Sequence, residues 1–98
     1  MLFLNQSNNV VGHILISQGG ISSTVVDVRM VFVSALKMGA SAIILAHNHP
    51  SGNLIPSEAD IRITKQIIKG DELLNIKVLD HLILSDDNYM SFGDDGLI

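Results

Sequence analysis

Short apolar runs separated by turn-forming residues predict five strands along the chain. Residues 41–46, Ser-Ala-Ile-Ile-Leu-Ala, are nearly all apolar, which is typical of a strand buried on both faces of a sheet. The Asn, Gln and Ser cluster at residues 5–9 predicts a turn that joins the first two runs into a hairpin. The predicted strands cover residues 1–4, 10–17, 41–48, 76–84 and 89–92.

Two other segments repeat their apolar residues at steps of three and four, which predicts helices. The first begins at Asp27, a residue that can cap a helix start, and ends before Gly39. The second runs from about Ser57 to Lys69, and Gly70 is expected to break it. The buried face of this second helix is expected to hold Ile61, Thr64, Ile67 and Ile68.

The order of these elements, ββαβαββ, predicts an α/β fold with a mixed central β-sheet flanked by helices. A chain of 98 residues makes a single domain with one core, and it contains no internal repeat or low-complexity tract. Gly19 and Gly20 lie in a predicted loop. They lack the third spaced glycine or the Lys-Ser/Thr of a phosphate-binding loop, so that interpretation is rejected.

Composition narrows the classes of protein further. Hydrophobic residues make up 47% and charged residues 16% of the chain, yet no apolar run approaches the roughly 18 residues needed to cross a bilayer. The sequence has no cysteine and no signal-peptide pattern at its start, so we expect a cytoplasmic protein without membrane contact. A net charge of −4 gives no support to nucleic-acid binding, and the pair Lys65 and Lys69 marks a solvated helix face.

The segment from His47 to Asp60 is where the sequence specifies chemistry. His47 and His49 lie two apart at the end of the 41–48 strand, so their side chains point to the same face. Ser57 begins a capping-box-like helix start, with Asp60 at the position where Glu or Gln is usual. A turn-rich loop can fold this carboxylate back to both imidazoles. Two imidazoles and one carboxylate are the three-ligand set of a catalytic zinc site.

Each histidine also has a plainer interpretation than metal binding. A bare His-x-His pair is weak evidence for metal, and only the addition of Asp60 makes zinc the favoured hypothesis. We expect His13, on the second strand, to be a surface residue. Asp80 and His81 lie inside the 76–84 strand, and two interpretations stay open for them. One of the two side chains orients a metal ligand, or the two alternate across the sheet and pack or hydrogen-bond near the site.

The same residues resemble the JAMM (MPN-type) metal-binding motif, His-x-His, seven residues, Ser, two residues, Asp, which the segment from His47 to Asp60 fits without gaps. The chain contains His-Asn-His-Pro-Ser-Gly, then Pro-Ser-x-x-Asp-Ile and Leu-Asp-His-Leu-Ile. With these motifs it resembles the bacterial RadC family over nearly its whole length. The resemblance implies a JAMM/MPN fold with a cytidine-deaminase-like layout. It implies zinc held by His47, His49 and Asp60, and a Ser57 that holds the water or the developing oxyanion.

One element of the JAMM pattern is missing from these 98 residues. The family carries a general acid/base glutamate on its first strand, whereas the two glutamates here, Glu58 and Glu72, both follow the histidine pair. Glu58 precedes Asp60 by two residues, about 200° around a helix, so it faces away from a metal that Asp60 binds. We therefore expect a C-terminal domain fragment, residues 1–98, truncated at its first strand, with weak or no turnover.

Two classes of function follow from these observations. The first is a RadC-like zinc hydrolase, a metallopeptidase or isopeptidase that acts on a peptide or protein. The second is a non-catalytic module that binds a protein partner, a second copy of the chain or a DNA-repair assembly, the process with which the RadC label is associated. Deaminase chemistry is excluded because its zinc site requires cysteines. A two-metal nuclease is disfavoured because it needs more carboxylates than Asp60 alone supplies.

Overall fold

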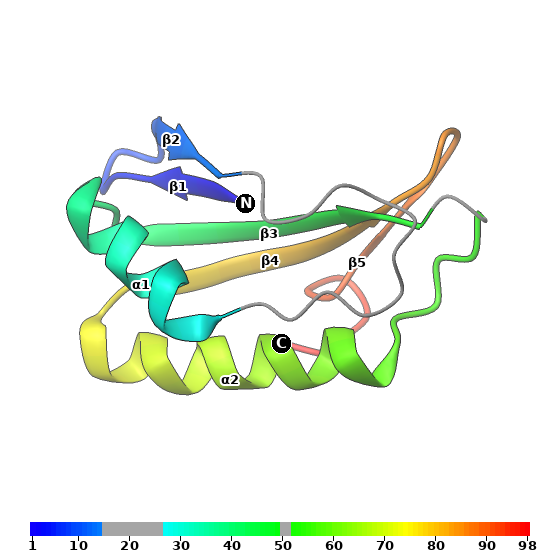
Figure 1. Ribbon diagram of the computed structural model, residues 1–98. Coiled ribbons are helices and arrows are strands. Elements are labelled where there is room, and N and C mark those ends of the chain that lie inside the picture. The colour runs from blue at the N-terminus through cyan, green and yellow to red at the C-terminus, as the bar shows by residue number, and fades with distance from the viewer. Residues whose placement is uncertain (15–26, 50–51) are drawn as a thin grey trace.

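A computed structural model describes residues 1–14, 27–49 and 52–98 of the chain. It shows an α/β domain with a five-stranded sheet and two helices, as the sequence predicts, and with the predicted element order (Figure 1). The elements are β1 (Leu2–Leu4), β2 (Val10–His13), α1 (Val28–Lys37), β3 (Ala42–Asn48), α2 (Glu58–Leu74), β4 (Lys77–Leu84) and β5 (Tyr89–Ser91).

The sheet is mixed, and its strand order is β2-β1-β3-β4-β5. β1 pairs antiparallel with both β2 and β3, β3 and β4 run parallel, and β5 returns antiparallel to β4. The parallel pair requires a crossover, which α2 provides. β3 lies at the centre of the sheet and is paired along both of its edges. The predicted burial on both faces holds only in part: Ile43 and Leu45 are buried, whereas Ile44 is half-buried and Ala46 is exposed, because both helices lie on the Ile43 side.

One hydrophobic core joins the strands to both helices. Phe3, Ile43 and Val78 are register partners on β1, β3 and β4, so they share one face of the sheet. They pack in a single cluster with Phe32 of α1 and Ile67 of α2. Phe3, Ile43 and Ile67 are each 0% exposed. Because Phe32 and Ile67 join the same cluster, both helices cover the same face of the sheet (Figure 1).

The first helix begins as predicted. The Asp27 carboxylate accepts a hydrogen bond from the Arg29 backbone N–H at 3.0 Å, which caps α1. Gly39, with φ of +66°, follows the end of this helix and lets the chain turn into β3. The capping box of α2 is also present, with Ser57 and Asp60 exchanging hydrogen bonds.

The predicted end of the second helix at Gly70 is wrong. The helix continues to Leu74 and ends at Asn75, which adopts the left-handed conformation with φ of +57°. Gly70 instead marks a close contact between the helices, because a Cβ there would lie 2.4 Å from Cε2 of Phe32. On the buried face, Thr64 and Ile67 are 1% and 0% exposed; Ile61 and Ile68, which flank them, are half-buried.

The remaining differences concern strand ends. β4 and β5 each fall one residue short of the prediction, at Ile76 and at Phe92. β2 ends at His13, and residues 15–17 of the predicted strand lie outside the described residues, as do Gly19, Gly20 and the rest of the predicted loop 18–23. Among the helices that the structure describes, none has the length and apolar content needed to cross a membrane.

Candidate metal centre

The carboxyl end of β3 positions both motif histidines. β3 pairs in parallel with β4 up to Asn48, and the His49 backbone N–H donates to the Leu84 carbonyl at 2.9 Å, so the ladder extends past the last strand residue. The two imidazoles therefore point to the same side, as predicted. Their ring centroids lie 4.7 Å apart, and the two Nε2 atoms are 2.9 Å apart.

The first turn of α2 brings Asp60 to these histidines. The Ser57 backbone N–H donates to Asp60 Oδ2 at 2.8 Å, and the Asp60 N–H donates to Ser57 Oγ at 3.0 Å. This capping box fixes the carboxylate with Oδ1 3.1 Å from His47 Nε2 and Oδ2 3.4 Å from His49 Nε2. Figure 1 shows the end of β3 and the start of α2 at the same end of the molecule.

One donor atom from each of His47, His49 and Asp60 lies within 4.8 Å of the other two. We call these residues the three-donor cluster; the structure thus brings the three predicted ligands together. Two ring nitrogens and a carboxylate oxygen at this spacing need a proton or a cation among them. The donor set of two nitrogens and one oxygen fits the requirements of zinc, and of catalytic zinc sites in particular.

The loop after β3 sets the orientation of His49. Nδ1 of this ring lies 2.7 Å from the Asn53 backbone carbonyl, which can only accept, so Nδ1–H donates and Nε2 is the ring atom that faces the cluster. Gly52 has φ of +80°, and its N–H donates to the His49 carbonyl at 3.0 Å. Gly52 and Asn53 thus hold His49 by both its backbone and its ring.

The electrostatics of the cluster favour the protonation states that a metal needs. Burial lowers the pKa of His47 by more than the attraction of Asp60 raises it, so this imidazole is neutral at pH 7. Burial raises the pKa of Asp60, but hydrogen bonds from Ser57 and the nearby rings of His47 and His49 outweigh it and lower the pKa overall. Neutral imidazole and ionised carboxylate are the metal-binding forms.

Ser57, the predicted catalytic residue, lies at the N-cap of α2 and is exposed. Its Oγ accepts the Asp60 N–H, and a hydroxyl that accepts one hydrogen bond retains its hydrogen for donation. Ser57 can therefore cap α2 and donate to a ligand at the same time. Glu58 is exposed in the same turn, and His13 is exposed on β2, which β1 separates from β3, as expected of a surface residue.

His81 is a site residue whose role the sequence left open. The sequence leaves open whether Asp80 or His81 orients a metal ligand or whether the two side chains only alternate across the sheet. In the structure, His81 Nε2 lies 2.9 Å from Nδ1 of His47, a predicted ligand. Burial lowers the pKa of His81 to about 4. Asp80 accepts from Ser91 Oγ at 2.6 Å and from the Gly93 N–H at 3.0 Å, so it connects β4 to the end of β5 and to the segment that follows.

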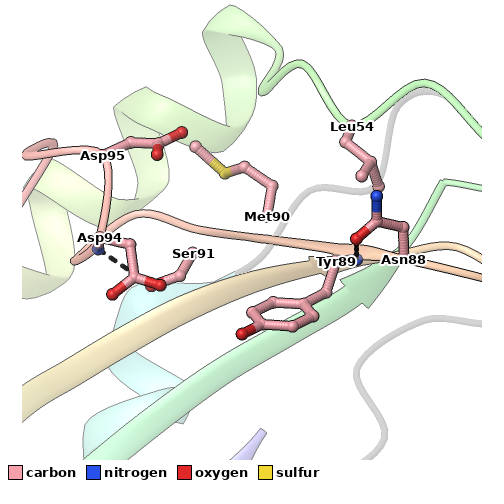
Figure 2. A pocket seen from close by; sticks show the side chains of 7 residues that line it. All are labelled: Leu54, Asn88, Tyr89, Met90, Ser91, Asp94 and Asp95. Carbon is pink, nitrogen blue, oxygen red and sulfur yellow. Dashed lines mark hydrogen bonds between the residues drawn. The ribbon is translucent and has the colours of Figure 1, made fainter.

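A hollow of about 430 Å³ adjoins this end of the molecule (Figure 2). Figure 2 shows Asp94 and Asp95 on one side of it and Leu54 and Asn88 on the other, with Met90 between them. Leu54 belongs to the loop between His49 and Ser57, whereas the three-donor cluster and Ser57 do not line the hollow. The described residues that line the hollow therefore lie beside the three-donor cluster, and the hollow does not enclose the cluster.

Comparison with known proteins agrees with this geometry. The family model described as RadC-like JAB domain matches residues 1–97. The chain belongs to the RadC-like JAB domain family. This result confirms the resemblance found in the sequence, and the mixed five-stranded sheet with two helices is consistent with a JAB/MPN fold. The family also supports a JAMM-type domain, to which the three-donor cluster corresponds.

Curated relatives of this RadC-like domain carry names that do not describe an activity. A UPF0758 protein of Flavobacterium johnsoniae is 53% identical over 97 residues, 99% of this chain and 42% of that protein. A UPF0758 protein of Porphyromonas gingivalis is 48% identical over 99 residues, 100% of this chain and 44% of that protein. UPF0758 protein YfjY of Escherichia coli is 46% identical over 98 residues, 100% of this chain and 61% of that protein. The chain thus spans about half the length of these relatives.

Proposed function

We propose that this RadC-like domain binds one zinc ion through His47 Nε2, His49 Nε2 and the Asp60 carboxylate, and that it serves a JAMM-type hydrolase that cleaves an amide or isopeptide bond in a peptide or protein. The observation that carries the proposal is the convergence of these three donors within 4.8 Å at one end of the sheet. Zinc in a three-donor protein site keeps a position open, acts as a Lewis acid and activates water near neutral pH.

Ser57 has a separate part in the proposed reaction. Because its hydroxyl retains a hydrogen while it caps α2, Ser57 donates to the oxyanion that develops on the substrate carbonyl. Loss of one such donor commonly costs about 2.7–4 kcal/mol of transition-state stabilisation. Asp60 remains ionised because the Ser57 backbone N–H donates to it, so the same capping box holds a ligand and the oxyanion donor.

The register of β1 supports a place for the proposed proton shuttle. Leu2 pairs with Ile44 in an antiparallel ladder, so residues that extended β1 before Met1 would lie opposite Ala46 and His47. A glutamate at that place would lie beside the cluster, whereas Glu58 is exposed two residues before Asp60. We therefore propose that an N-terminal extension supplies the general acid/base, and that residues 1–98 alone turn over about 10²–10⁴-fold more slowly.

The zinc site is tested by elemental analysis of protein purified without added metal or chelator. We expect close to one zinc per chain, and loss of that zinc in Asp60→Asn, which keeps the size of the side chain and removes its charge. Glu58→Gln is the matched control, because it removes the same charge from the same helical turn but faces away. Equal zinc in all three proteins, or none in any after zinc is offered, contradicts the proposal.

The hydrolase is tested with a chimera that carries, ahead of Met1, the preceding residues of the Flavobacterium johnsoniae relative. Fluorogenic peptides and an isopeptide-linked conjugate serve as substrates. We expect hydrolysis by the chimera and its loss when a glutamate that the extension places opposite Ala46 or His47 is replaced by glutamine. A zinc-loaded chimera that leaves every substrate intact removes the hydrolase proposal, and the non-catalytic interaction module then becomes the leading interpretation.

A further inference from the structure

A buried line of hydrogen bonds connects α2 to the back of the three-donor cluster. Thr64 Oγ1 lies 2.8 Å from the Asp60 backbone carbonyl and 2.6 Å from His81 Nδ1. His81 Nε2 in turn lies 2.9 Å from His47 Nδ1. Thr64 is 1% and His81 3% exposed, so water has little access to this line. It begins at the carbonyl of Asp60 and leads back, through His47, to the carboxylate of Asp60.

The chemistry of Thr64 decides where the hydrogens lie. A backbone carbonyl can only accept, so the single hydroxyl hydrogen of Thr64 points to the Asp60 carbonyl. The 2.6 Å contact with His81 is then a hydrogen bond only if His81 Nδ1–H donates to Thr64 Oγ1. The opposite arrangement would place two acceptors 2.8 Å apart in a buried position. One tautomer of His81 therefore satisfies both contacts.

This tautomer has a consequence for His47. A neutral His81 with its hydrogen on Nδ1 presents a lone pair at Nε2, so it accepts from His47 Nδ1–H. The other nitrogen of His47, Nε2, then keeps its lone pair and faces His49 and Asp60. With the reverse tautomer of His81, His47 would carry its hydrogen on Nε2, the atom that a metal must approach. The ring of His81 is also fixed by stacking on Phe92, with centroids 4.4 Å apart and an interplanar angle of 17°.

We propose that Thr64 and His81 are positioning residues that hold His47 in its Nδ1–H tautomer and so reserve His47 Nε2 for the metal. The proposal rests on the proposed zinc site. The usual partner of a metal-bound imidazole is a carboxylate or a carbonyl. Here the partner of His47 is a second imidazole, His81, which is itself oriented by Thr64 of α2. We call the line from Thr64 through His81 to His47 the relay. Asp60, the proposed third ligand, also anchors the relay through its backbone carbonyl.

The first test reads the tautomers directly and needs no metal. Long-range proton–nitrogen NMR spectra of metal-free protein with 15N-labelled histidine distinguish a protonated from an unprotonated ring nitrogen. We expect His81 to carry hydrogen on Nδ1 only, and this assignment to be lost in Thr64→Val, which keeps the shape of the side chain. A wild-type His81 with its hydrogen on Nε2, or a spectrum unchanged in Thr64→Val, overturns the relay.

The second test measures the dissociation constant for zinc by competition with a chromogenic chelator. We expect zinc binding to weaken about 10–100-fold in Thr64→Val, the range found for partners of metal ligands, and to return to the wild-type value in Thr64→Ser. Ile67→Val, a buried change one turn along α2, controls for loss of packing. Equal affinity of wild type and Thr64→Val overturns the positioning role. If wild type binds no zinc, the proposed function fails instead, and the NMR result alone decides the relay.

Discussion

At the scale of single residues, His47 and Asp60 each have two assigned roles. Asp60 completes the capping box with one carboxylate oxygen and approaches His47 with the other. His47 contacts His81 through Nδ1 and faces the cluster through Nε2. Burial and hydrogen bonding hold His47 neutral and Asp60 ionised at pH 7. In the proposed function, these residues are already in their metal-binding forms before a cation binds, which lowers the cost of organising the site.

The buried His81 predicts how the stability of the metal-free protein depends on pH. Burial, with the neighbouring His47 as a second cause, lowers its pKa from 6.5 to about 4. As pH falls below 6.5, the unfolded chain takes up the proton while the folded protein does not, so folding becomes less favourable. The loss begins near pH 6.5, is complete near pH 4 and amounts to about 3 kcal/mol.

Urea unfolding at several pH values, with EDTA present, checks this prediction. His81→Asn cannot titrate, so its free energy of unfolding should fall less steeply between pH 6.5 and 4 than that of wild type. The comparison uses the slope and not the absolute stability, which the substitution also lowers. Parallel slopes for the two proteins would show that His81 titrates normally in the folded state.

At the scale of elements, the site is built where a strand ends and a helix begins. β3 presents the histidine pair, residues 52–56 lead into α2, and the capping box of α2 sets the carboxylate. α2 is itself seated against α1 through Gly70, where Phe32 occupies the space that a side chain would need. The position of Asp60 along the sheet thus depends on how α2 packs more than a turn away.

Gly70→Ala tests this packing. In an exposed helix, alanine is about 1 kcal/mol more favourable than glycine. Here its Cβ would lie 2.4 Å from Phe32 Cε2, and overpacking of this kind typically costs about 1–3 kcal/mol. We expect a net loss of stability in urea unfolding. Lys69→Ala, the neighbouring exposed position on α2, should change little; a Gly70→Ala protein more stable than wild type would refute the packing role.

The local features of the fold and site were predictable from the sequence, and the features that depend on distant contacts were not. The apolar run before His47 and the Ser57-x-x-Asp60 start of α2 act over a few residues, so their patterns were sufficient. Gly70 was misread as a helix end because its reason is a contact with Phe32 in another helix. The role of His81 depends on the parallel pairing of β3 with β4. This pairing brings His81 to His47, which lies 34 residues earlier in the chain.

At the scale of the whole molecule, the three-donor cluster joins two elements that are separate in the unfolded chain. A ligand that binds only the folded protein stabilises it by mass action, by about 2.7 kcal/mol at a free concentration 100 times the dissociation constant. We therefore expect zinc to raise the thermal unfolding midpoint of wild type and EDTA to reverse the rise. Glu58→Gln should respond like wild type, and a similar rise in Asp60→Asn would place the zinc elsewhere.

The overall charge of the molecule bears on its partners. With a formal net charge of −4, the domain lacks the excess of basic side chains that displaces counterions from a phosphate backbone. The hydrolase proposal accordingly names a peptide or protein substrate. In an electrophoretic mobility assay at physiological salt, we expect no retardation of duplex DNA by this domain; salt-sensitive retardation would count against that choice of substrate.

The zinc-edge X-ray absorption spectrum of the zinc-loaded protein identifies the atoms that bind the metal. We predict two imidazole nitrogens and a carboxylate oxygen at about 2.0–2.2 Å, with no sulfur ligand. In Asp60→Asn offered the same zinc, we expect no such spectrum, because this variant retains no zinc. A spectrum with three imidazoles would make His81 a ligand and remove its positioning role. A spectrum unchanged in Asp60→Asn, or zinc coordinated by carboxylates alone, would contradict the account.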